Sequence, residues 1–144
     1  MEIRPFHPSD QPAAKALILA GLVEHWGWLD PTLNSDLDDI AASYADGIFL
    51  VVYEGERLVG TGALLPEGEN GGRIVRMSVD RGERKKGYGR ELLHVLLQAA
   101  KDTGYNQVVL ETTATWVDAI RFYEANGFHR THETDGDVHF IRAI

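Results

Sequence analysis

The sequence predicts a mixed α/β fold in which a central sheet of about seven strands carries helices on both faces. Seven strand-like runs and four helix-like runs follow one another in the order β-α-α-β-β-β-α-β-α-β-β. The early strands are joined by hairpins and the later ones by helical crossovers, so the sheet needs antiparallel and parallel neighbours. The 144 residues are enough for one domain with a single sizeable core, expected over residues 1–144.

The N-terminal part of the chain is expected to supply one edge strand and two helices. Residues 2–6 alternate in polarity and contain a proline, which favours a strand at the edge of a sheet. Ser9 or Asp10 can cap a first helix that runs to about Trp26. A capping pattern then predicts a second helix within residues 35–47.

The middle of the chain is expected to form three consecutive strands. Residues 48–53 are a continuous apolar run, typical of a strand covered on both faces. A turn at residues 54–57 leads to a partner strand at 58–65, and residues 73–79 form the next strand. Strict alternation along this last strand would place three side chains on one face: Val75, Met77 and Val79.

The C-terminal half should alternate between helices and strands. A helix is expected over residues 87–103 and a buried strand over residues 107–112. A second helix at residues 116–126 precedes a final hairpin within residues 128–143. This hairpin is exposed and could pair with a second copy in a homodimer.

The composition excludes several classes of protein and site. There is no cysteine, so disulfides, cysteine-ligated metals and a cysteine acyl-enzyme are absent, and no metal site is expected. The net charge of -8 argues against nucleic acid as a partner. No apolar run approaches the ~20 residues that span a bilayer, and the first residues do not resemble a signal peptide. We therefore expect no membrane association and a cytoplasmic location.

The charges are distributed unevenly along the chain. Basic residues cluster within residues 81–90, whereas no Lys or Arg lies between Lys15 and Arg57, a stretch that is rich in Asp and Glu. A basic pole would suit a phosphate ligand, and an acidic half would suit a cationic amine. The simpler alternative for most of these carboxylates is a solvated surface that keeps the protein soluble.

The segment Arg84-Lys85-Lys86-Gly87-Tyr88-Gly89 has the composition of an anion site. It lies between a predicted strand and a predicted helix. Gly87 and Gly89 allow a tight turn and a close approach of the backbone to a ligand. The first N–H groups of the helix and the positive end of its dipole favour phosphate.

The spacing of the glycines excludes two common phosphate loops. Tyr88 and Gly89 stand where a P-loop requires Lys and Ser or Thr, and Leu92 replaces the third glycine of a dinucleotide loop. The remaining pattern, R-x-x-G-x-G, resembles the acyl-CoA pyrophosphate loop of the GNAT N-acetyltransferase superfamily. Residues 119–128 are similar to a second signature of that superfamily, A-x-x-x-Y-E-x-x-G-F.

This resemblance covers nearly the whole chain and implies how acetyl-CoA would bind as co-substrate. Two parallel strands, residues 73–79 and 107–112, would splay apart to form the acyl-CoA cleft. Backbone groups of three residues would pair with the pantetheine arm: Met77, Ser78 and Val79. The pyrophosphate would lie on the loop and the helix start: Arg84, Lys85, Lys86, Gly87, Tyr88, Gly89 and Arg90.

The resemblance also implies the catalytic residues. Tyr123 stands at the family's tyrosine position, where a phenol can protonate the leaving thiolate; the alternative is ordinary aromatic packing. Glu111 is the first candidate for the base, against a water chain or a surface role. Trp116 stands where the family often has an asparagine, and it would line the cofactor groove by stacking.

The function that follows is an N-acetyltransferase that transfers the acetyl group to a primary amine by direct attack in a ternary complex. The acceptor is either a small molecule or a peptide amine. His25, Trp26, Trp28 and Tyr44 lie where GNAT proteins commonly shape the acceptor pocket, and the tryptophans can receive a cation on their ring faces. Ordinary packing at the helix end explains these residues equally well. The alternative function is a non-catalytic acyl-CoA sensor or regulatory module.

Overall fold

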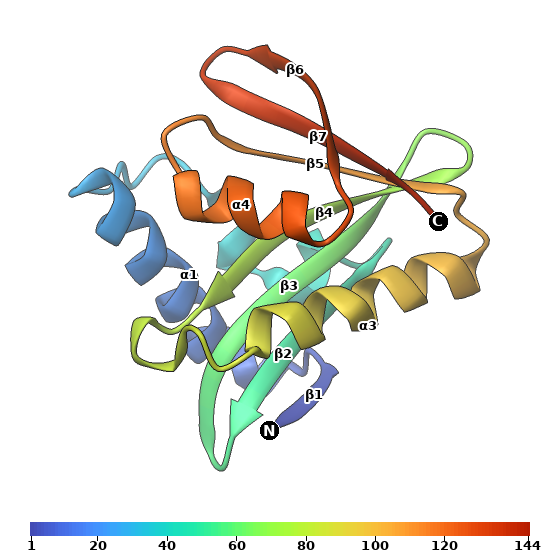
Figure 1. Cartoon of the computed structure of the whole chain (residues 1–144). Helices are drawn as coiled ribbons and strands as arrows, with labels where there is room; N and C mark the ends of the chain where they lie inside the picture. Colours follow the sequence, from blue (N-terminus) through green and yellow to red (C-terminus); the bar gives the residue numbers. More distant parts are fainter.

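The computed structural model describes all 144 residues and contains one seven-stranded sheet with helices on both faces (Figure 1). The strand order is β1-β2-β3-β4-β5-β7-β6, so the first strand lies at one edge, as its proline predicts. The strands are β1 (Glu2–Pro5), β2 (Ile48–Glu54), β3 (Arg57–Glu67), β4 (Gly71–Val79), β5 (Gln107–Thr113), β6 (His129–Thr134) and β7 (Asp137–Ala143). The α-helices are α1 (Gln11–Trp26), α2 (Ile40–Ser43), α3 (Tyr88–Thr103) and α4 (Val117–Ala125), and the 3-10 turns are η1 (Pro8–Asp10), η2 (Ser35–Asp38) and η3 (Arg81–Glu83).

Two separate apolar cores cover the two faces of the sheet. Helices α3 and α4 pack on one face, and α1, η2 and α2 pack on the other. Strand β2 serves both cores because neighbouring side chains point to opposite faces: Val52 packs beneath α3, and Val51 packs beneath α1. This explains why residues 48–53 read as a continuous apolar run.

Strands β4 and β5 are the parallel pair, and they separate after a short contact. Only three residue pairs join them, from Gly71↔Gln107 to Arg73↔Val109. Beyond this point β4 stays paired with β3, and β5 stays paired with β7. The remaining edges of β4 and β5 therefore face each other across an opening, which confirms the predicted splay of these two strands.

A bulge interrupts β4 at the opening. Ala63 pairs with Val75 and Thr61 pairs with Ser78, so β4 has one more residue than β3 over this interval. Arg76 lies in the bulge with φ 56, and its carbonyl accepts a hydrogen bond from Thr61 Oγ1 at 2.8 Å. The expectation that Val75, Met77 and Val79 share a face is wrong, because the bulge turns Val75 toward the α1 core and Met77 toward the α3 core.

The segment predicted as a second helix is shorter than expected. It forms the turn η2 and the four-residue helix α2, and Asp39 caps α2 by accepting from Ala42 N at 3.2 Å.

The final hairpin agrees with its turn sequence, since Asp135 and Gly136 both have positive φ. None of the helices is long and apolar enough to cross a membrane.

Candidate active site

The loop between β4 and α3 presents a run of free backbone donors. The N–H groups of residues 84–90 have no hydrogen-bond acceptor within the protein, and the first bond of the helix joins Glu91 N to Gly87 O at 3.0 Å. No side chain caps α3. Gly87 has φ 87, a conformation that a residue with a Cβ adopts only with strain. The loop geometry therefore leaves these donors open to an anionic ligand.

The side chains of this loop have different partners. Arg84 donates two hydrogen bonds to Glu24 of α1, at 2.6 and 2.7 Å, and a third to Val79 O at 3.1 Å. The bond from Arg84 lowers the pKa of Glu24. Lys86 pairs with Glu83 at 2.7 Å.

Of the remaining loop side chains, Lys85 and Arg90 point to solvent and Tyr88 contacts another turn. Lys85 and Arg90 are exposed and make no ion pair. The Tyr88 hydroxyl donates to Glu54 on the β2–β3 turn, away from the helix start. Of the predicted pyrophosphate-binding positions, Tyr88 thus offers its backbone rather than its side chain.

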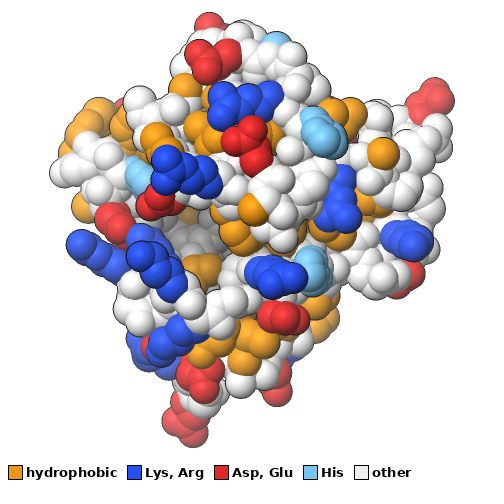
Figure 2. All heavy atoms as spheres, viewed as in Figure 1, with side chains coloured by type: hydrophobic (Ala, Val, Ile, Leu, Met, Phe, Trp, Pro, Cys, Tyr) orange, Lys and Arg blue, Asp and Glu red, His pale blue; other side chains and the backbone are white.

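The end of β4 leads from the opening to this loop. Met77, Ser78 and Val79 lie beyond the last residue of β4 that pairs with β5, and all three are partly exposed. Figure 2 shows a hollow between α4 and the β4–α3 loop, with Lys and Arg side chains along its rim. The predicted pantetheine and pyrophosphate segments therefore follow one continuous edge.

Tyr123 lies on the α3–α4 face of the sheet. Its ring packs against Phe122, Phe128 and Phe140, with centroid distances of 5.2, 5.8 and 6.1 Å. The hydroxyl makes no hydrogen bond within the protein, yet no fully buried polar side-chain atom lacks a partner, so this oxygen reaches accessible space. Burial raises the pKa of Tyr123, which keeps the phenol protonated and able to donate.

Trp116 connects the start of α4 to the end of α1. It immediately precedes α4, and its ring stacks on His25 at 3.9 Å and lies 5.8 Å from Trp26, both in the last turn of α1. One face of its ring is therefore engaged by His25 of α1, and the predicted stacking against a cofactor remains a prediction.

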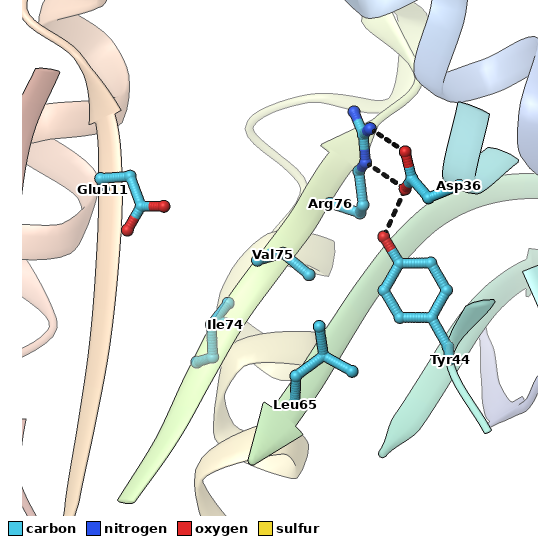
Figure 3. A pocket seen from close by; sticks show the side chains of 7 residues that line it. All are labelled: Asp36, Tyr44, Leu65, Ile74, Val75, Arg76 and Glu111. Atoms are coloured by element: carbon cyan, nitrogen blue, oxygen red, sulfur yellow. Dashed lines mark hydrogen bonds and ion pairs between the residues drawn. The ribbon is translucent and has the colours of Figure 1, made fainter. Parts of the chain in front are cut away.

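A pocket of about 360 Å³ lies between the separated strands on the α1–α2 face (Figure 3). Leu65, Ile74 and Val75 supply its apolar wall. The polar lining consists of Asp36, Tyr44, Arg76 and Glu111.

A hydrogen-bonded network orders one side of this pocket. Arg76 binds Asp36 through two hydrogen bonds, at 2.7 and 3.1 Å, and a third reaches Asn34 Oδ1 at 3.1 Å. Tyr44 donates to Asp36 at 2.6 Å. Burial would raise the pKa of Asp36, but the bonds from Arg76 and Tyr44 outweigh it and lower that pKa. Burial and the bond to Asp36 raise the pKa of Tyr44 to about 12.

Glu111 lies on the opposite wall of the pocket, on β5 (Figure 3). Its carboxylate forms an ion pair with Arg73, which also binds Glu67. The neighbouring Leu110 packs in the core beneath α3 and α4, so Glu111 points to the other face of the sheet. Glu111 and Tyr123, the two predicted catalytic residues, thus lie on opposite faces of the sheet.

Sequence reasoning missed two features of this site. It did not find the Arg76–Asp36–Asn34 network, because Arg76 reaches residues about forty positions away. It did not find Glu24 as the partner of Arg84, sixty positions away. The only available signal was the lack of Lys and Arg between Lys15 and Arg57, which pointed to an acidic region without pairing its members.

Known proteins share both the sequence pattern and the fold. The profile of the Acetyltransferase (GNAT) family matches residues 15–128. A probable N-acetyltransferase family 8 member 5 of Mus musculus is 39% identical over 106 residues, which cover 69% of this chain and 47% of that protein. The N-acetyltransferase 8B of Homo sapiens is 32% identical over 115 residues, covering 74% and 51%. The chain thus spans about half the length of the curated relatives that it matches.

Solved structures show the same fold at low sequence identity. An acetyltransferase of the GNAT family from Staphylococcus aureus Mu50 superposes with a TM-score of 0.90 at 22% identity, covering 99% of this chain and 98% of that one. The PaiA N-acetyltransferase of Thermoplasma acidophilum, solved in complex with coenzyme A, has a TM-score of 0.87 at 17% identity and the same coverage. With the splayed strands, the free loop donors and the profile match over most of its length, the chain belongs to the acetyltransferase (GNAT) family.

Proposed function

We propose that residues 1–144 form an acetyl-CoA-dependent N-acetyltransferase that acetylates a primary amine. The observation that carries the proposal is the run of unpaired N–H groups at residues 84–90, next to the free edge of β4. These donors suit the diphosphate of an acyl-CoA, and the backbone of Met77, Ser78 and Val79 suits the amides of its pantetheine arm.

The chemistry follows from the two faces of the opening. The neutral amine attacks the thioester carbonyl carbon from the pocket on the α1–α2 face; the new C–N bond forms and the C–S bond breaks. Tyr123, on the other face, donates its proton to the departing sulfur, and its raised pKa favours the protonated phenol. A backbone N–H at the end of β4 stabilises the developing oxyanion.

The amine must also lose a proton, and Glu111 is the proposed acceptor, directly or through water. Its carboxylate lines the pocket where the strands separate. The ion pair with Arg73 engages Oε2 of that carboxylate, which leaves Oε1 for the amine or a water.

Calorimetric titration with acetyl-CoA, with ATP and NAD as controls, tests the first half of the proposal. Saturable binding of acetyl-CoA alone is expected. Equal affinity for acetyl-CoA, ATP and NAD would mean that the loop binds anions without specificity. Release of free CoA thiol in the presence of an amine panel tests the second half.

The ion pair of Glu111 favours a second candidate, a non-catalytic acyl-CoA sensor. Such a protein would bind acetyl-CoA and release no thiol with any amine. The two candidates therefore differ in one measurement on the same purified protein.

A further inference from the structure

An apolar surface continues from the end of α1 into the loop before η2. Its tryptophans and one leucine are unusually open to solvent: Trp26 is 52% exposed, Trp28 67% and Leu33 63%. They border a second pocket of about 220 Å³, which is lined by Leu22, Trp26, Trp28, Leu29, Asp30, Leu33 and Asn34. Exposed apolar side chains grouped around a hollow mark a binding site more often than isolated ones do.

A hydrogen-bonded wall separates this apolar pocket from the pocket between the strands, and the two pockets have no lining residue in common. Asn34 lines the apolar pocket and accepts a hydrogen bond from Arg76 at 3.1 Å. Arg76 and its partner Asp36 line the pocket between the strands. A ligand that crosses this wall would place one end at the opening between β4 and β5 and the other end against the tryptophans.

The charge around the apolar pocket selects the sign of its ligand. No Lys or Arg occurs between Lys15 and Arg57, so the segment that builds the pocket carries no positive side chain of that kind. Asp30 lines the pocket, and tryptophan faces attract cations. An amine with an apolar body therefore fits this surface better than a carboxylate or a phosphate does.

We propose that the acceptor is a primary amine bearing one compact apolar group, such as an aryl ring, and that this group lies against Trp26, Trp28 and Leu33. The size is suitable, since an apolar cavity of about 150 Å³ holds one benzene molecule. This inference rests on the proposed acetyltransferase function and adds the chemical class of its acceptor. The amine end enters the pocket beside Asp36 and Glu111, where the acetyl group would be transferred.

The experiment compares 2-phenylethylamine with ethylamine and putrescine as acceptors in the thiol-release assay. We expect kcat/KM for 2-phenylethylamine to exceed that for ethylamine by about tenfold or more, because burial of the ring adds to binding. Trp28→Ala should raise the KM for 2-phenylethylamine by about tenfold, and by more than it raises the KM for ethylamine. Leu33→Ser is a second variant at an equally exposed site, and Val95→Ala, an exposed apolar residue of α3, is the control.

Several outcomes would overturn the inference. Putrescine as the best substrate, or an equal loss for both monoamines in Trp28→Ala, would exclude a ring-binding role for this surface. If the wild-type protein sediments as a homodimer and the Trp28→Ala variant sediments as a monomer, the surface binds a second copy of the chain instead. Turnover of ethylamine in either case would leave the acetyltransferase proposal standing.

If no amine is acetylated, the acetyltransferase proposal fails, and direct binding still tests the surface. Calorimetric titration with 2-phenylethylamine should show binding that Trp28→Ala and Leu33→Ser weaken and Val95→Ala does not. The absence of binding, or equal binding to all four proteins, would overturn the inference independently of catalysis.

Discussion

The two sides of the opening between β4 and β5 draw their polar groups from different parts of the chain. On the loop side, the donors are backbone N–H groups of consecutive residues, 84–90. On the pocket side, the polar groups are side chains that come from η2, the α2 exit, the β4 bulge and β5. The loop side is local in sequence, whereas the pocket side is assembled from distant segments.

This difference determines how each side should respond to substitution. Backbone donors are the same for every residue type, so such a site depends on glycine geometry and tolerates change elsewhere. Side-chain networks such as Arg76–Asp36 change with single substitutions. We therefore expect variants on the loop side to affect acetyl-CoA, and variants on the pocket side to affect the amine.

The largest expected effect follows the removal of one hydroxyl. Tyr123→Phe should lower kcat by about 100-fold, because a general acid contributes at least that much to proton transfer. The Kd for acetyl-CoA and the stability should hardly change, since the hydroxyl has no partner within the protein. Tyr105→Phe, which alters a partly buried tyrosine at the far end of β5, is the control. Unchanged kcat in Tyr123→Phe would remove Tyr123 from the mechanism.

The next effect tests the loop geometry. Gly87→Ala should weaken acetyl-CoA binding by about tenfold, because a Cβ strains the positive-φ conformation by roughly 1–2 kcal/mol. Gly104→Ala is the matched control: Gly104 lies at the other end of α3 with φ 96 and equally open space around its Cα. Calorimetry should show weaker binding only for Gly87→Ala, with both variants less stable in urea. Equal binding by both would place the phosphates elsewhere.

A smaller effect concerns the pocket network. Asp36→Asn should raise the KM for the amine by about fivefold and destabilise the fold by about 1 kcal/mol, since it weakens charged hydrogen bonds in a half-exposed site. The acetyl-CoA affinity should not change. Asp10→Asn is the comparison, because Asp10 is buried and pairs with Arg4 away from the opening. It should destabilise the protein more and leave the KM for the amine unchanged.

The same variants give a pH test. The pKa of Asp36 and that of Asp10 are both lowered in the folded protein, because the bonds to arginine and tyrosine outweigh burial. A lowered carboxyl pKa stabilises the fold above the ordinary value of about 3.9, and this contribution disappears as the pH falls through the lowered pKa. The stability gap between wild type and each variant, measured in urea, should therefore be full at pH 7 and shrink toward acid. A gap that widens on acidification would contradict the assigned pairing.

The smallest expected effect comes from a single loop charge. Lys85→Ala should weaken acetyl-CoA binding by only about twofold to threefold, because exposed charges interact weakly in water. The loss should diminish at high salt, where exposed charges are screened. Lys101→Ala, at the exposed far end of α3, should have no effect. A large loss for Lys85→Ala would mean that side-chain charge, rather than the backbone donors, dominates the loop side.

The bulge in β4 shows where sequence reasoning stopped. Alternation predicts one face for Val75, Met77 and Val79, yet the extra residue at Arg76 places Val75 against the α1 core and Met77 against the α3 core. The sequence of β4 contains no glycine at the bulge that would have predicted it, since Arg76 itself takes the positive φ. The bulge also directs Arg76 toward Asp36, so this wall of the pocket could not be predicted from the sequence.

The sequence by itself determined the order of the strands and helices, the position of the loop and the family signatures. These follow from local rules: hydrophobic period, turn glycines and short motifs of adjacent residues. Only the tertiary structure decided the partners of Arg84 and Arg76, the stacking of Trp116 on α1 and the hydrogen bond between the two pocket linings at Asn34. Those contacts connect residues tens of positions apart, and their geometry depends on where the sheet bulges and separates, which no local pattern records.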